Sequence, residues 1–293
     1  FITDKVTTTV TLEDKSKKTV TWYQFKIPIL KHESRVGQIQ DFKSIRFIRM
    51  FMSGFTDSIV LRFARLQLNR SEWRSNNPLT SPVTLIGQTM GADSSTLNVS
   101  TVNREENGTR TPIPYVLPPG IQQERNFQDV RGATFRNEQS LSLNVCNLKD
   151  GQARAAYKNV SLDFRSYKHI EMFMHAEGAG LKDGDVRAFV RLGTDYNANY
   201  YEYEIPMQIT PNGSNKPDII WPAVNKLDIP FSVLQLAKQS RNDAAFRVDS
   251  VYAYNPGGGN TVYVRGQPDL SKVRVIMVGV RNPADDGVER CAE

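Results

Sequence analysis

The 293-residue sequence has few of the residues on which enzymes and metal proteins usually depend. It contains only two cysteines and three histidines. His169 and His175 lie six residues apart on one predicted strand, which separates them by about 20 Å, and neither they nor His32 has a nearby cysteine or second histidine. No nucleophile elbow, phosphate-binding loop or dinucleotide-binding fingerprint occurs. We therefore predict no catalytic residues, no metal site and no cofactor.

Long apolar runs and concentrated charge are also missing. No apolar run approaches the roughly 18–20 residues of a membrane helix. Lys and Arg number 37 against 31 for Asp and Glu, but no block of five or more basic residues occurs. This spread-out charge argues against a nucleic-acid partner. The first residue is Phe1, with no leader pattern after it, so we expect a piece of a longer protein or a mature product, itself soluble.

Acidic pairs are present, but in turn-like contexts. Asp183 and Asp185 flank a glycine, and Asp285 and Asp286 precede another. Loops of this kind sometimes bind Ca²⁺ in sandwich proteins, but the spacing of an EF-hand is absent. We interpret both pairs as turn residues.

One phrase of the sequence occurs twice at a domain-sized spacing. Tyr167 repeats Phe42 after 167 − 42 = 125 residues, and Phe189 repeats Phe63 after 189 − 63 = 126. Between these points Met50-Phe51-Met52 reappears as Met172-Phe173-Met174. The spacing is too long for a solenoid repeat, so it predicts two copies of a whole domain.

Alternating, β-branched segments predict many short strands. Val6–Leu12 and Val20–Ile27, joined by a charged turn, predict a hairpin, and Phe231–Lys238 alone is typical of a helix. The other predicted strands are Ile45–Met52, Val60–Leu68, Leu141–Val145, Ile170–Met174, Val186–Leu192, Tyr200–Ile205, Phe246–Tyr254, Thr261–Arg265 and Lys272–Val280. The expected fold is all-β, with two tandem jelly-roll-like, galactose-binding-like antiparallel β-sandwiches.

The repeat and a proline-rich stretch predict the domain limits. Residues 1–108 would form the first sandwich, 109–136 a Pro-rich connector, 137–287 the second sandwich and 288–293 a tail. Thr111–Gly120 contains four prolines, which exclude a helix interior or a central strand. Its apolar residues, among them Ile113 and Tyr115, lead us to expect that it packs on a sandwich.

Two groups of residues are candidates for interaction. Alternation places Val186, Ala188, Val190 and Leu192 on one face of a strand and Phe189 and Arg191 on the other, where Phe63 and Arg65 match them in the first copy. This outer face could be a recognition surface, although interdomain packing is the favoured interpretation. Tyr201, Tyr203 and Trp221 could form a sugar-stacking platform, and for them we favour packing in the core or rim.

Several strings, taken in order, resemble the SprA/Sov family of Bacteroidetes cell-surface proteins. The most specific is the Pro-rich string Glu106–Gly120. The others are Trp22–Pro28, Phe47–Phe55, Leu61–Arg65, Asn137–Leu143, Ala153–Lys158, Leu181–Asp185 and Tyr200–Pro206. The resemblance implies the giant outer-membrane β-barrel translocon of the type IX secretion system, which serves protein secretion and gliding motility. This chain lacks barrel strands, so it would be a non-catalytic structural or interaction region, in the extracellular cap rather than the periplasm.

The resemblance also implies partners and a location. The partners would be the rest of the translocon barrel, a shuttle protein of the PorV type, a periplasmic plug protein and the secreted cargo. The location would be the cell outer membrane, on its extracellular side. The alternative function is a pair of secreted carbohydrate-binding modules attached to a larger hydrolase.

The two cysteines are predicted to bond to each other. Cys146 ends the first predicted strand of the second copy, and Cys291 follows its last. The first and last strands of an antiparallel sandwich commonly run side by side, and the implied compartment outside the cytoplasm preserves disulfides. The alternative is two unrelated buried thiols.

Overall fold

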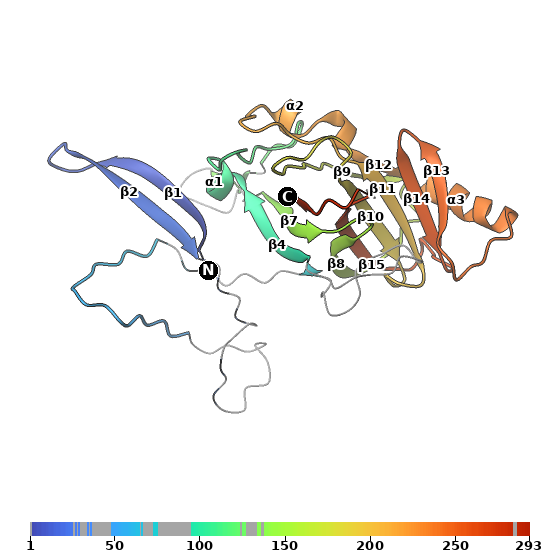
Figure 1. The fold of residues 1–293 in the computed structure, drawn as a ribbon, viewed down its shortest axis with the longest axis horizontal. Helices are drawn as coiled ribbons and strands as arrows, with labels where there is room; N and C mark the ends of the chain where they lie inside the picture. The colour runs from blue at the N-terminus through green and yellow to red at the C-terminus, as the bar shows by residue number, and fades with distance from the viewer. Residues whose placement is uncertain are drawn as a thin grey trace. The chain divides into compact units, whose positions relative to one another are not determined.

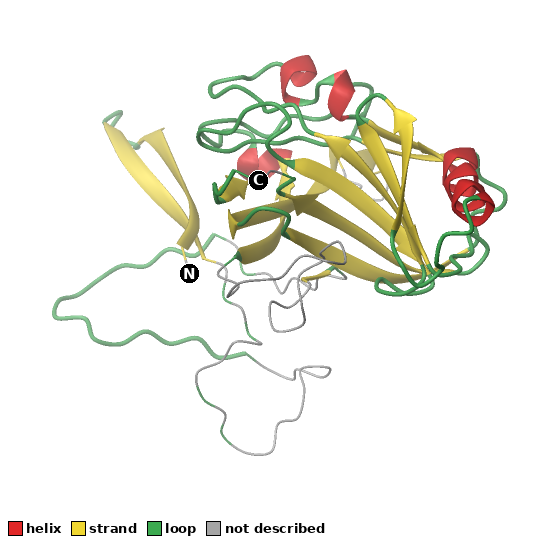
Figure 2. Cartoon of the chain, turned by 45° about the vertical axis from the view of Figure 1, so that its right-hand side comes forward, coloured by secondary structure: helices red, strands yellow, loops and turns green. Residues whose placement is uncertain are grey.

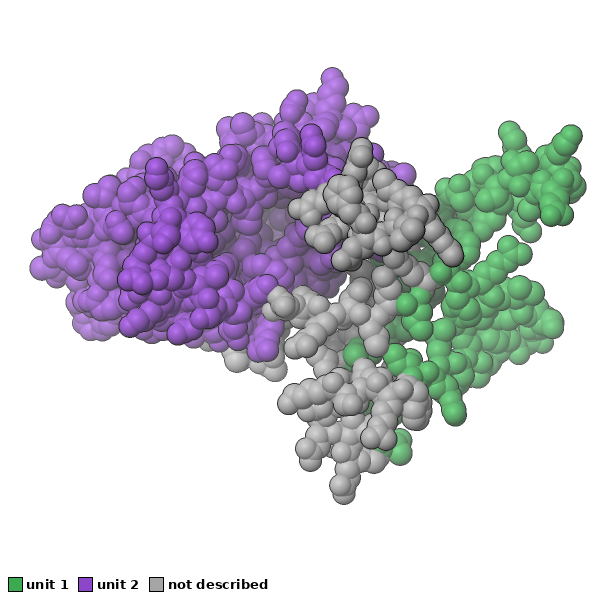
Figure 3. All heavy atoms as spheres, turned by 180° about the vertical axis from the view of Figure 1, so that it is seen from behind, with its two compact units in different colours: residues 1–69 green, residues 70–293 purple. Residues whose placement is uncertain are grey.

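The computed structural model describes residues 2–25, 48–64, 73–75, 95–123, 125–126, 134–135, 138–283 and 286–293, with the single residues 27, 29, 34, 36 and 66. The chain divides into two compact units, Phe1–Asn69 and Arg70–Glu293, coloured separately in Figure 3. Each unit is described by itself.

The first unit contains the predicted hairpin. Strand β1 (Ile2–Thr11) pairs antiparallel with β2 (Lys17–Phe25). The chain reverses at Lys15, whose φ of 63° lies in the left-handed region, and Leu12 donates a backbone hydrogen bond to Ser16. The segment 48–64 forms no strand, so the prediction of strands over Ile45–Met52 and Val60–Leu68 is wrong for the residues described. Alternation specifies which side chains share a face, but a strand also needs a partner.

The second unit is an antiparallel β-sandwich, which confirms the predicted all-β class (Figures 1 and 2). One layer is a seven-stranded sheet in the order β13-β14-β11-β10-β15-β8-β3. Its strands are β3 (Arg74–Ser75), β8 (Ala153–Leu162), β10 (Arg187–Gly193), β11 (Tyr200–Pro206), β13 (Tyr252–Gly257), β14 (Asn260–Arg265) and β15 (Val273–Arg281).

The opposite layer is built from two smaller sheets. One pairs β9 with β12, and the other has the order β16-β7-β4. Their bounds are β4 (Thr96–Asn103), β7 (Gln139–Leu148), β9 (His169–Met172), β12 (Leu227–Pro230) and β16 (Arg290–Ala292). Two-residue strands β5 (Arg125–Asn126) and β6 (Thr134–Phe135) pair with each other, and α1 (Arg104–Asn107), α2 (Pro217–Ile220) and the 3₁₀ turn η1 (Ala223–Asn225) lie in connections.

The main core lies between the layers. The predicted inner face of the β10 region, Val186, Ala188, Val190 and Leu192, is buried there. Helix α3 (Phe231–Asp243), drawn red beside the sheets in Figure 2, covers one end of it. Its buried residues Phe231, Leu234, Ala237 and Arg241 recur at helical spacing on one face. The helix therefore exists as predicted and continues past Lys238.

The pairing of β3 and β4 differs from the predicted division of the chain. Both strands lie before residue 108, yet β3 pairs with β8 and β4 pairs with β7. Backbone pairing thus draws these strands into the sandwich of the second unit, and residue 108 falls inside that unit. A separate first sandwich stays a prediction, because much of the chain before Ser95 lies outside the described residues.

The Pro-rich stretch Thr111–Gly120 is packed, as predicted. Ile113 and Tyr115 are 1% and 8% exposed and cluster with Ile220 and Trp221. The Trp221 indole donates a 2.9 Å hydrogen bond to the Val116 carbonyl. These contacts hold the stretch on the side of the sandwich that carries α2.

Helices long and apolar enough to cross a bilayer do not occur in the described parts of the chain.

Candidate functional site

The two pairs of predicted outer-face residues are Phe63/Arg65 and Phe189/Arg191, and Phe63 and Phe189 do not occupy matching positions in the structure. Phe63 lies in the first unit with 64% of its surface exposed and belongs to no strand, while Arg65 lies outside the described residues. Phe189 and Arg191 do share a face of β10, but they are only 0% and 5% exposed. The predicted face is therefore correct, and its burial agrees with packing, the favoured interpretation, although the packing is within this unit: Phe189 clusters with Ala155 and Met277.

A buried ionic lattice occupies that side of the sheet. Arg191 Nη2 lies 2.5 Å from Glu202 Oε2, and Arg281 Nη2 lies 2.6 Å from Glu202 Oε1. Arg281 Nε also lies 2.6 Å from Glu204 Oε2, and Arg187 Nε pairs with the other oxygen of Glu204 at 2.6 Å. Three arginines and two carboxylates thus form one chain of pairs across β10, β11 and β15.

The lattice keeps the Glu202 carboxylate ionised in spite of burial. Burial alone would raise the pKa of Glu202, but the charges of Arg191 and Arg281 outweigh it and hold the pKa below its usual value. Burial would likewise lower the pKa of Arg281, and the charges of Glu202 and Glu204 raise it instead. Arg281 Nη1 has no hydrogen-bond partner among the residues that the structure describes, although the Arg281 guanidinium lies 5.2 Å from the Phe189 ring centroid. The three guanidinium groups exceed the two carboxylates by one positive charge, and each of the five groups has at least one oppositely charged partner.

Gly279 makes room for this packing. A Cβ atom there would lie 2.3 Å from Phe189 Cζ and 2.7 Å from the Ala155 Cβ. The Phe189 ring can therefore lie over β15 only because position 279 has no side chain.

The sequence contained a signal for the lattice that our interpretation missed. Arg187, Phe189 and Arg191 alternate along one strand, and Glu202 and Glu204 alternate along the next. Once β10 and β11 are paired antiparallel, Arg191 stands directly opposite Glu202. Opposed charges on neighbouring strands would have indicated ion pairs.

The aromatic candidates are buried in the sandwich. Tyr201 and Tyr203 are 4% and 6% exposed in the main core, and burial raises the pKa of Tyr201 to about 12. Trp221 is 8% exposed beneath the Pro-rich stretch. Sugar stacking needs exposed ring faces, so these residues form no such platform in the structure.

Cys146 and Cys291 form a disulfide. Strand β16, which carries Cys291, runs antiparallel beside β7, which carries Cys146. The first and last strands of this part of the chain thus lie side by side, as the prediction assumed. The bridge closes a loop with a sequence separation of 145 residues.

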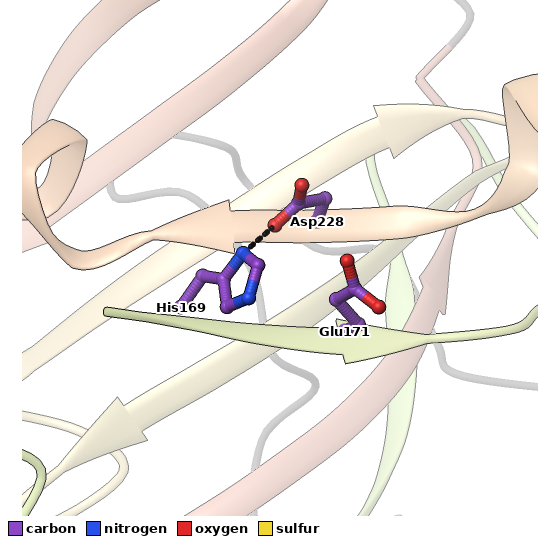
Figure 4. Close-up of side chains that lie close together, drawn as sticks. All are labelled: His169, Glu171 and Asp228. Carbon is purple, nitrogen blue, oxygen red and sulfur yellow. Dashed lines mark ion pairs between the residues drawn. The ribbon is translucent and has the colours of Figure 1, made fainter. Parts of the chain in front are cut away.

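An exposed charge cluster joins β9 to β12 (Figure 4). His169 Nδ1 lies 3.0 Å from Asp228 Oδ1, and Glu171, two residues along the same strand, stands opposite Asp228. Ligand atoms of the three residues lie within 4.8 Å of one another. Lys226 Nζ lies 2.9 Å from Glu171 Oε2, and this hydrogen bond lowers the pKa of the Glu171 carboxyl. We assign the cluster as a set of surface polar contacts, because each carboxylate already has a side-chain partner, Lys226 for Glu171 and His169 for Asp228. No local pattern indicated this cluster, because Asp228 comes from a strand distant in the chain.

The most site-like feature is an apolar cavity of about 410 Å³ between the layers. It is lined by β10 and β15 on one side and by β7 and the β9 region on the other, with Trp73 and Trp221 also in its wall. Its volume and its mainly apolar lining are those of a typical ligand site.

Polar groups gather at one part of the cavity wall. Arg110 pairs with Glu177 and, at 2.8 Å, with Glu293. Ser142 donates a 2.9 Å hydrogen bond to Glu293, and His175 Nε2 lies 3.4 Å from Glu177. These groups bond to one another, Ser140 bonds to the Tyr115 hydroxyl at 2.7 Å, and most of the remaining wall is apolar.

Comparison with known proteins identifies the family. A family model described as motility related/secretion protein, SprA_N, matches residues 1–293. The chain belongs to the SprA_N family. This membership confirms the resemblance to the SprA/Sov proteins and gives the chain a role in secretion and motility. No curated protein matches the chain.

Proposed function

We propose that this SprA_N region is a non-catalytic structural and interaction part of the outer-membrane translocon for type IX protein secretion and gliding motility. The observation that carries the proposal is the family match, which covers residues 1–293. The region would work on the extracellular side, in contact with the rest of the barrel. A PorV-type shuttle, a plug protein and secreted cargo are the further partners we propose.

The disulfide supports a location outside the cytoplasm. Bridges such as Cys146–Cys291 persist in oxidising compartments and are rare where thiols are kept reduced. The buried lattice supports a structural role, since its arginines and glutamates pair with one another inside the unit.

The first unit supports an interaction role. Two-stranded hairpins are at best marginally stable alone, and one face of β1–β2 carries Val6, Val10 and Trp22, which are 36–41% exposed. Phe51 and Val60 are more than 80% exposed. Apolar surface of this extent is typical of a protein interface, and we propose that the translocon covers it.

A deletion in the native protein tests the proposal. Removing residues 1–293 in frame should abolish export of cargo into the medium and gliding, while the remaining protein is still found in the outer membrane by immunoblot. Normal secretion and gliding would refute the proposed function.

A milder variant pair separates interaction from folding. Val6→Asp with Val10→Asp charges the apolar hairpin face and should reduce secretion. Thr7→Asp with Thr9→Asp places the same charges on the opposite face of β1 and should leave it near normal. Equal effects of the two pairs would count against a covered hairpin face.

A further inference from the structure

The apolar cavity has no part in the proposed function, and its shape indicates what it could bind. One wall is lined by every second residue of the β10 region, Val186, Ala188, Val190 and Leu192. The six residue steps from Val186 to Leu192 span about 20 Å of extended chain. The neighbouring strand β15 lines the cavity in the same way, with Ile276, Val278 and Val280. The cavity is therefore elongated and runs parallel to the strands.

Neither vacuum nor water suits this space. Protein interiors are close-packed, and voids larger than a water molecule are few. Ordered water needs two to four polar partners at each position, and apolar cavities stay dry. The polar groups of the wall gather at one part of it and are hydrogen-bonded to each other. An apolar occupant fits the remaining length best.

The charges at the polar part restrict the occupant further. Arg110 contributes one positive charge, against one negative charge each from Glu177 and Glu293. A protonated His175 would bring the sum to zero and no higher. Glu138, bonded to Tyr115 at 2.7 Å, adds further negative charge nearby. This set offers no excess of positive charge to an anionic headgroup.

We propose that the cavity binds one long, unbranched hydrocarbon chain whose head carries no negative charge. Ester-linked lipids contain such chains, and long-chain alcohols present the same chemistry. Pockets of this volume lined mainly by apolar side chains, with a few polar groups at one place, are typical ligand sites. The inference is independent of the role in secretion, since it concerns binding to the isolated chain.

Ligand titration of the whole 293-residue chain tests the proposal, with tryptophan fluorescence as the signal because Trp73 and Trp221 line the cavity. The probes are 1-dodecanol, glycerol monododecanoate and dodecanoate at pH 8. The alcohol should bind saturably with one molecule per chain, and the carboxylate at least tenfold more weakly. Binding of the ester as tightly as the alcohol indicates a lipid source; binding of the alcohol alone indicates a free chain. No saturable binding of alcohol or ester, or equal binding of the carboxylate, would overturn the proposal.

A cavity-filling substitution provides the second arm. Ala188→Leu adds side-chain volume to the wall and should raise the melting temperature while weakening dodecanol binding at least tenfold. Asn159→Leu adds a leucine at an exposed position of the same sheet and should leave binding unchanged. A lower melting temperature for Ala188→Leu with unchanged binding would show that no such cavity exists.

Discussion

Replacing Glu202 with glutamine should destabilise the sandwich by about 3–5 kcal/mol, because it removes the charge that neutralises two buried arginines. Arg191 and Arg281 are 5% and 3% exposed, and both contact the Glu202 carboxylate. Glutamine keeps the shape of the side chain but cannot balance either guanidinium. Urea unfolding followed by circular dichroism measures the effect.

An exposed pair supplies the matched control for this substitution. Asp249 pairs with Arg247 at 2.7 Å, but both side chains are more than 60% exposed. Surface pairs of this kind contribute little, so Asp249→Asn should leave the unfolding midpoint essentially unchanged. A loss below about 1 kcal/mol for Glu202→Gln would mean that the lattice is not a main source of stability.

The pH dependence of the free energy of unfolding is a second test of the contribution of Glu202 to stability. The folded-state pKa of Glu202 lies below its ordinary value of 4.5. Its contribution is therefore complete above that pH and is lost as the pH falls through the lower folded-state pKa. The stability of the Glu202→Gln variant should fall less steeply on acidification than that of the parent chain.

Reducing the disulfide should lower the free energy of unfolding by about 2–5 kcal/mol. The bridge joins residues 145 apart, and the chain-entropy model gives about 5 kcal/mol as an upper figure for a loop of that length. Cys291 lies on the short terminal strand β16, so loss of the bridge also releases that strand from β7. Urea unfolding with and without a reducing agent measures the difference.

The double variant Cys146→Ser with Cys291→Ser is the control for the disulfide. It should match the reduced parent chain and show no further response to the reductant. If the unfolding midpoint of the parent chain is the same with and without the reducing agent, the disulfide does not contribute to stability.

Local patterns predicted those features that depend on one segment at a time. The period-two alternation of Val186–Leu192 gave the correct inner face of β10, and the charged turn after Leu12 gave the hairpin. The position of the two cysteines near the ends of one sandwich was enough to predict their pairing.

Features that depend on distant partners were not predictable in the same way. Burial of Arg191 requires Glu202 on the next strand and Arg281 near the end of the chain. The pairing of β4 with β7 places residue 108 inside the second unit, whereas the predicted limit rested on the repeat and the Pro-rich stretch. The cavity is formed by side chains from many separate segments of the chain, and no single segment contains a sign of it.

The most direct test of the extracellular placement is thiol labelling on living cells. Both cysteines of the chain are bonded to each other, so Asn215→Cys, in an exposed loop before α2, adds one free thiol to this region. In the full-length protein we expect a membrane-impermeant maleimide to label this cysteine on intact cells, while the parent protein sets the background. Labelling that appears only after the outer membrane is permeabilised would place the region in the periplasm and contradict the account.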